Sequence, residues 1–184
     1  MCRKQSIALM VFCLVQAGCY QVAYTVQTDG SQTPPPSSNQ MRLAVWGTTP
    51  SVVGAATTWL QKRGAAVIER TRLNQILIEQ KVRLTATPDR ESDLLAIGKL
   101  AGASVLVFAD GRAIPGNASV SVRAVDVESA VVLWSGSAQY TGQLVYVDYA
   151  LAGLTCEALA TAWGFRQPGQ HKVKESEHCQ TPRK

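Results

Sequence analysis

The sequence predicts an α/β (α+β) fold, a mixed sheet with helices packed on it in a single domain. Between residues 41 and 110, short apolar runs alternate with segments whose apolar residues recur every three or four positions, which is typical of alternating strands and helices. "SVLVFAD", Ser104 to Asp110, has the continuous apolar centre expected of a strand buried on both faces. Two later segments alternate apolar and polar residues around a short turn, which predicts an antiparallel hairpin and therefore a mixed sheet.

The first two strands are expected on either side of a helix. "RLAVWG", Arg42 to Gly47, has the length and apolar content of a short buried strand. Pro50 and Ser51 then open a helix, with Ser51 as the expected N-cap, and Gly64 ends it. "AAVIE", Ala65 to Glu69, predicts the second strand.

Two further helices are expected before the central strand. Thr71 is the expected cap of the first, in which Leu73 and Ile76 share an apolar face. The second starts at Thr87-Pro88-Asp89, because proline suits the first helical position and an acidic residue suits the first turn. Gly102 ends this helix.

The hairpin and a long helix complete the predicted domain. Pro115-Gly116-Asn117 forms a turn, and the segment around Val120–Ala124 pairs with the segment 130–140. In that second segment one face is expected to carry Val132, Trp134, Gly136 and Ala138. A helix from about Leu144 to Trp163 closes the domain.

The N-terminus has the layout of an export signal. Arg3 and Lys4 precede an uncharged apolar run over residues 7–15, which is far shorter than the ~20 residues that span a bilayer. Small residues up to Gly18 then precede Cys19, and this stretch resembles a bacterial lipobox, cut between Gly18 and Cys19, whose cysteine carries acyl chains such as palmitate. The alternative is an ordinary secreted protein cut nearby, with a free Cys19.

The expected organisation has four parts: a signal peptide at 1–18, an anchor and linker at 19–40, a globular domain at 41–165 and a polar, disordered tail at 166–184. The linker "QTDGSQTPPPSSNQ" has no large apolar residue. From Cys19 to Gln40 such a tether reaches about 70 Å fully extended and about 25 Å as a flexible coil. Tyr20 stands where an aspartate would favour inner-membrane retention, so the outer membrane, facing the periplasm, is expected.

Charge and residue types argue against several function classes. The formal net charge is +5, and the basic residues are scattered, so no footprint for nucleic acid is expected. The two histidines, His171 and His178, both lie in the tail, so no nucleophile–histidine pair can be proposed in the domain. These histidines and Cys179 could form a loose metal site, but a solvated tail is the favoured interpretation. We therefore expect no enzyme, no cofactor and no metal.

Cys156 and Cys179 are the two cysteines that follow Cys19 in the chain. An exported chain meets oxidising conditions, so the two can form a disulfide that holds the tail to the last helix. A cysteine in a disordered tail can equally stay free.

The last helix has two apolar faces. Val147, Leu151, Leu154 and Ala158 share one side at 100° per residue and can pack on the sheet. The opposite side is also apolar, and its members are Tyr149, Ala152, Cys156, Leu159 and Trp163. We expect this second face to bind a neighbouring subunit or partner, with Trp163 as anchor. The alternative is that the tail covers it.

Three stretches resemble the CsgG-like family of bacterial envelope lipoproteins (CsgG, PelC and LpoB type). They are "VIERTRLNQILIEQK" from Val67, "AIGKLAGASVLVFADG" from Ala96 and "ASVSVRAVDVESAVVLWSGS" from Ala118. The family's hairpin turn usually has glycine where Ala130 stands. The resemblance implies an anticodon-binding-domain-like fold without catalysis.

This resemblance implies a structural or accessory subunit of an envelope export or assembly machine, of the curli- or exopolysaccharide-secretion kind. The expected partners are the membrane, through the lipid anchor, and further copies of the chain or another envelope protein. The alternative is an LpoB-like regulatory lipoprotein that activates a peptidoglycan synthase (penicillin-binding protein). Such an activator must reach the inner membrane, and the short tether disfavours it.

Overall fold

A computed structural model describes residues 23–31, 41–68, 73, 75–76, 91–142, 146–174 and 179. Its seven-stranded sheet has the order β3-β2-β4-β5-β6-β1-β7. The elements are β1 Ala23–Gly30, β2 Arg42–Trp46, α2 Pro50–Gln61, β3 Ala66–Ile68, α4 Glu91–Leu100, β4 Val105–Ile114, β5 Asn117–Asp126, β6 Val132–Thr141, α5 Val147–Ala162 and β7 Gly169–Lys174.

The sheet is mixed, as predicted. β2 runs parallel to both β3 and β4. From β4 to β7 every neighbouring pair is antiparallel. The predicted α/β fold class is therefore confirmed, including the antiparallel hairpin of β5 and β6.

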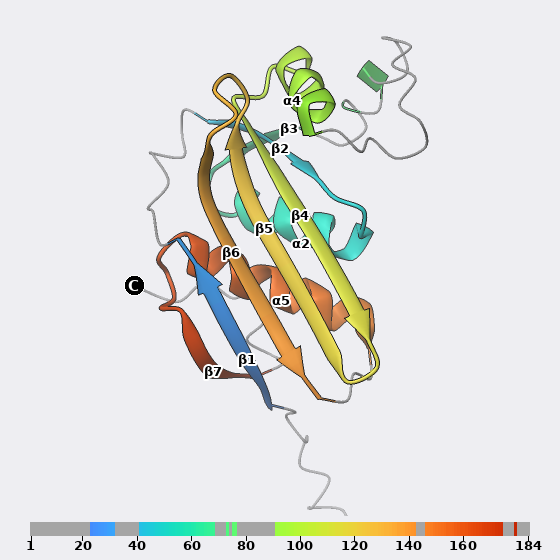
Figure 1. Cartoon of the computed structure of the whole chain (residues 1–184), viewed down its shortest axis with the longest axis vertical. Helices are drawn as coiled ribbons and strands as arrows, with labels where there is room; N and C mark the ends of the chain where they lie inside the picture. Colours follow the sequence, from blue (N-terminus) through green and yellow to red (C-terminus); the bar gives the residue numbers. More distant parts are fainter. Residues whose placement is uncertain are drawn as a thin grey trace, which may run out of the picture.

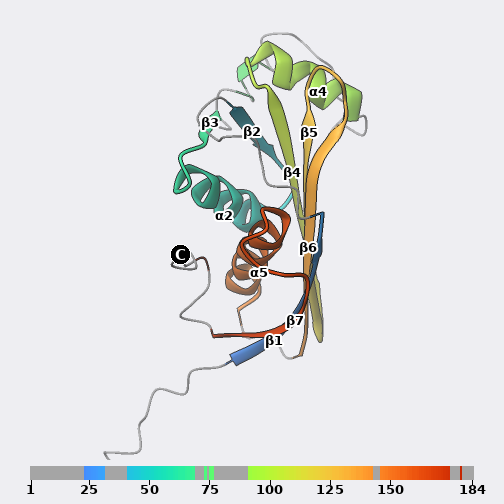
Figure 2. The same cartoon turned by 90° about the vertical axis from the view of Figure 1, so that its left-hand side faces the viewer.

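The helices lie on both faces of the sheet. α2 and α5 lie side by side on one face, and α4 covers one end of the other face (Figures 1 and 2). The larger core fills the space under α2 and α5 and includes Trp134, Leu60 and Leu159. A smaller core lies under α4 and includes Leu106 and Phe108 of β4. β4 thus has buried side chains on both faces, as its continuous apolar run predicts.

Both ends of the expected domain organisation need correction. Residues 23–30, assigned to the anchor and linker, form β1, and residues 169–174, assigned to a disordered tail, form β7. β1 pairs with β6 on one side and with β7 on the other. The sequence did not reveal these strands because their inward positions include polar residues such as Thr28 beside Val26. Backbone hydrogen bonds between neighbouring strands stabilise them in addition to the burial of side chains.

This correction changes the tether. Three residues, Tyr20 to Val22, lie between Cys19 and Ala23, the first residue of β1. The flexible reach expected for residues 19–40 therefore does not apply. Cys19 itself and Gly18 lie outside the described residues.

Two local predictions are also wrong. α2 begins at Pro50 with Thr49 as its N-cap, so Ser51 lies inside the helix. Thr49 Oγ1 instead donates a hydrogen bond to the Gly111 carbonyl oxygen at 2.9 Å. Val132 was expected to face inward but is 50% exposed, because a bulge next to Val125 shifts the register of β5 and β6.

Of the first helix expected after the second strand only fragments are described, whereas the second is described over Glu91–Leu100 as α4. Leu73 and Ile76 are helical and buried, which agrees with their predicted apolar face. The expected cap Thr71 and the start at Thr87-Pro88-Asp89 lie outside the described residues. Among the described helices, none has the length and apolar content needed to span a bilayer.

Candidate functional site

A buried carboxylate ties the last helix to the last strand. Glu157 of α5 is 3% exposed. Its Oε2 atom lies 2.8 Å from Arg166 Nε and 3.2 Å from His171 Nε2. His171 was expected in a solvated tail, but the pairing of β7 with β1 turns it toward α5. Because a buried carboxylate without partners is costly, this cluster fixes β7 under the helix.

An aromatic cluster joins the C-terminal ends of α2 and α5. The rings of Trp59 and Trp163 meet edge to face with centroids 5.1 Å apart, and Trp134 of β6 lies 5.9 Å from Trp163. The Arg63 guanidinium lies over Trp59, 3.4 Å from the ring centroid, and 4.9 Å from the ring of Phe165. Burial lowers the pKa of Arg63 to about 10, so the side chain stays charged at neutral pH and keeps its cation–π contact.

This cluster corrects the expected assembly surface on the last helix. Trp163 is 6% exposed and Leu159 is fully buried. The second apolar face of α5 is covered by α2, which lies beside it in the same layer (Figure 2). Leu159 and Trp163 are therefore core residues and not an interface. The sequence indicated two apolar faces correctly but did not show which element of the same chain covers the second.

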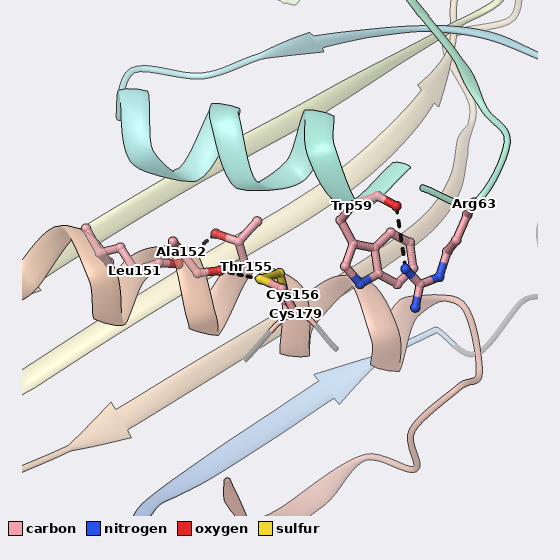
Figure 3. The surroundings of a disulfide bond; sticks show 7 residues. All are labelled: Trp59, Arg63, Leu151, Ala152, Thr155, Cys156 and Cys179. Carbon is pink, nitrogen blue, oxygen red and sulfur yellow. Dashed lines mark hydrogen bonds between the residues drawn. A yellow bond between two sulfur atoms is a disulfide. The ribbon is translucent and has the colours of Figure 1, made fainter. Parts of the chain in front are cut away.

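Cys156 and Cys179 are joined by a disulfide in the structure, with their Cα atoms 5.0 Å apart. Cys156 lies on the side of α5 that faces α2, and the Cys179 sulfur lies 3.7 Å from the Ala152 carbonyl oxygen (Figure 3). In the residue before Cys156, Thr155 Oγ1 donates a hydrogen bond to the carbonyl oxygen of Leu151, one helical turn earlier, at 2.7 Å. The disulfide brings the C-terminal segment against the junction of the two helices.

The remaining two interface candidates line a groove between the helices. Tyr149 is 48% exposed and Ala152 is half-buried. They border a mainly apolar cavity of about 570 Å³, which we call the helix groove. Its other lining residues are Ser51, Gly54, Ala55, Thr58, Trp59, Lys62, Asp148 and Cys179. The structure thus separates the five expected interface residues into a buried set and a surface set.

The opposite face of the sheet carries a polar depression that sequence reasoning missed. A cavity of about 360 Å³ lies over β1, β4, β5 and β6 and is lined by Asp29, Asp110 and Ser121, among others. At its edge Arg123 makes two hydrogen bonds to Glu91 of α4, at 3.1 and 3.0 Å. Both side chains are about two-fifths exposed, so this pair adds little stability. The sequence signal for this depression is the row of polar residues that alternates with the buried positions of β5.

The described residues offer no group of three or more His, Cys, Asp or Glu side chains that could hold a metal ion. His178, which belonged to the weak metal alternative, lies outside the described residues. The other two members of that alternative are engaged elsewhere, His171 with Glu157 and Cys179 with Cys156.

Comparisons with known proteins give structural matches alone. No family model and no curated protein matches the chain. A PelC dodecamer subunit from Paraburkholderia phytofirmans is 15% identical, with 77% of this chain and 99% of that chain covered at a TM-score of 0.49. Lipoprotein GNA1162 from Neisseria meningitidis is 15% identical, with 66% and 94% covered at 0.48. The LpoB C-terminal domain from Escherichia coli is 13% identical, with 58% and 86% covered at 0.45. At these values the similarities carry no functional argument.

Proposed function

We propose that this chain is a non-enzymatic lipoprotein, attached through Cys19 to the outer membrane and facing the periplasm. It serves as a structural or accessory subunit of an envelope export or assembly machine, of the curli- or exopolysaccharide-secretion kind. One observation carries the proposal: the sheet begins at Ala23, only four residues after the lipobox cysteine. A domain held so close to its anchor works at the membrane surface.

The same distance argues against a regulatory role at the inner membrane. Four residues extend at most about 14 Å. An activator of a peptidoglycan synthase has to cross much of the periplasm, and β1 leaves no long arm between Cys19 and the fold. The Cys156–Cys179 bridge supports export, because disulfides persist in oxidising compartments.

The helix groove is the surface that fits a second copy of the chain. Its lining includes Gly54 and Ala152, small residues that let another chain approach closely, and the half-exposed Tyr149 beside them. Lys62 and Asp148 contribute opposite charges to the lining. In a two-fold dimer each lysine can therefore face the aspartate of the other copy.

Mass spectrometry of the mature N-terminus tests the lipoprotein part of the proposal. We expect a diacyl- or triacylglyceryl mass on a chain that begins at Cys19. An unmodified N-terminus at another residue contradicts it.

Light scattering of the purified chain tests the assembly part. A Cβ at Gly54 meets nothing within 4 Å, so Gly54→Arg fills the groove without a clash in the fold. We expect the parent and the control Gln61→Arg, at an exposed site on the same helix outside the groove lining, to form an oligomer. We expect Gly54→Arg to be monomeric with an unchanged circular dichroism spectrum. A monomeric parent, or an oligomer that survives Gly54→Arg, contradicts the second-copy assignment.

A further inference from the structure

Exposed apolar side chains gather at the end of the molecule where β1 begins. Ile114 at the end of β4 is 50% exposed, Tyr146 at the N-cap of α5 is 72% exposed, and Val147 is 45% exposed. We call these three residues the anchor-side patch. They come from two elements that end or start at the same end of the sheet (Figure 1). Neither core cluster includes them.

The strand register places the start of β1 at this end. Ile114 pairs with Asn117 across the β4–β5 turn, and Asn117 pairs with Thr141 at the end of β6. Val26 pairs with Tyr140, the residue before Thr141, so Ala23 lies slightly beyond the level of the patch. β1 and β4 are three strand spacings apart, about 14 Å, and this separation runs sideways across the strands.

We propose that the anchor-side patch lies on the phospholipid surface of the bilayer that holds Cys19. The inference rests on the lipid anchor of the proposed function. Cys19 is at most about 14 Å from Ala23, and the headgroup layer is itself about 5 to 8 Å thick. An acylated Cys19 at the membrane surface therefore brings this end of the sheet to the headgroups, with the strands pointing away from the bilayer.

The side chains of the patch suit that position. Tyrosine places an apolar ring and a polar hydroxyl at the boundary between lipid and water, and Ile114 and Val147 add apolar area. Arg112 and Lys172 are exposed near the same end and can meet lipid phosphates. Asp148 is the exposed acidic residue beside the patch, and the N-terminal dipole of α5 stabilises its charge.

The opposite end of the molecule provides a matched comparison. Leu100 on α4 is 57% exposed, and Val131 and Val132 at the β5–β6 turn are 56% and 50% exposed. These exposures are comparable to those of the anchor-side patch, but the three residues lie at the far end of the sheet from Ala23 (Figure 1). Apolar exposure alone would bring both ends to lipid, whereas the anchor selects one.

Fluorescence quenching in vesicles tests the inference. The full lipidated chain carries a single added cysteine, Tyr146→Cys, Ile114→Cys or Leu100→Cys, labelled without reductant by a polarity-sensitive fluorophore so that the native disulfide stays intact. The protein is reconstituted in vesicles of phosphatidylethanolamine and phosphatidylglycerol, with and without bromine-labelled lipids. We expect a blue-shifted, quenched signal at positions 146 and 114, and an unquenched signal at position 100.

Each other outcome counts against the inference in a recognisable way. Chains that float with the vesicles while position 146 stays unquenched overturn the inference and leave the anchor standing. Equal quenching at positions 146 and 100 shows contact without a preferred end, and it also overturns the inference. Protection of position 146 that rises with protein density, without quenching by lipid, assigns the patch to a second copy. An unmodified N-terminus overturns both the anchor and the patch assignment.

Discussion

Gly136 of β6 is the point where α5 rests on the sheet, and replacing it with alanine tests this packing. A Cβ at position 136 would lie 2.3 Å from the Ala158 carbonyl oxygen and 2.9 Å from the Ala162 Cβ. The first contact is with helix backbone, which has no flexible end that can turn away. An ordinary carbon–oxygen contact needs about 3.4 Å, so α5 has to retreat by roughly 1 Å.

The size of the effect follows from that retreat. A gap of about 0.5 to 1 Å removes a quarter to a half of the attraction between facing atoms. Leu154, Ala158 and Leu159 of α5 are almost fully buried and would lose contact together. Overpacking of a core costs about 1 to 3 kcal/mol, and we expect Gly136→Ala near 3 kcal/mol. The melting temperature should then fall by about 6 to 12 °C.

Urea and thermal unfolding of Gly136→Ala beside Gly54→Ala measure this prediction. Gly54 lies on the exposed side of α2 with open space around a Cβ, so the same substitution should stabilise the helix by about 0.5 to 1 kcal/mol. The two variants therefore differ in sign. A Gly136→Ala protein within 0.5 kcal/mol of the parent, a change in the range usual for a surface substitution, would show that α5 does not rest on β6 at this residue.

Three further predictions concern stability. Ala130 has a φ of 56°, which costs a residue with a side chain about 1 to 2 kcal/mol. Ala130→Gly should therefore raise the free energy of unfolding, measured in urea, by about 0.5 kcal/mol after the backbone entropy of glycine is subtracted. A decrease would contradict the turn geometry. The Cys156–Cys179 bridge closes a separation of 23 residues, so the double variant Cys156→Ala, Cys179→Ala should have a free energy of unfolding about 3 kcal/mol lower than the parent. An unchanged unfolding midpoint would show that the bridge does not form. Hydrogen bonds from Ser129 lower the pKa of Asp126 in the folded state. The ionised carboxylate therefore stabilises the fold fully above the unfolded-state pKa, and this contribution is lost as pH falls through the folded-state pKa. Below about pH 4 the melting temperature of the parent should fall more steeply than that of Asp126→Asn, and parallel curves would refute the prediction.

The elements that the sequence predicted well are those whose hydrophobic pattern is strong over several residues. The continuous run of β4 and the alternation in β5 are direct consequences of burial on two faces and on one face. α5 was found for the same reason, within a few residues of its observed ends. The close packing of α5 on the sheet, in contrast, is possible because Gly136 has no side chain, and no hydrophobic periodicity reveals this.

The strands at both ends were missed because their pattern is weak. The inward positions of β1 include Thr28, which is almost fully buried and donates a hydrogen bond to the Gly169 carbonyl oxygen of β7. The inward position of β7 is occupied by His171, whose partner Glu157 lies 14 residues earlier in the chain. Each strand appears polar alone, and each becomes a strand because the other supplies backbone partners. A single-segment pattern cannot show such mutual dependence.

For a related reason, the sequence could not show which of the expected interface residues lie at the surface. Tyr149 and Leu159 belong to one apolar face of α5, and both were expected to lie in the same interface. Only the position of α2 divides that face, since it buries Leu159 completely and leaves Tyr149 half-exposed at the helix groove. The partner of a helix face is a property of the tertiary arrangement.

The C-terminal segment also explains how the fold can withstand a pull on the proposed anchor at Cys19, four residues before the first residue of β1. Any pull on Cys19 acts on β1, and an edge strand can be peeled from a sheet one hydrogen bond at a time. β7 removes that weakness because it makes β1 an interior strand, paired on both sides. β7 is in turn held to α5 by His171 and Glu157, and beyond it the chain is tied to the same helix by the Cys156–Cys179 bridge. Loss of the bridge should therefore loosen β1 and β7 first, which hydrogen exchange can resolve strand by strand.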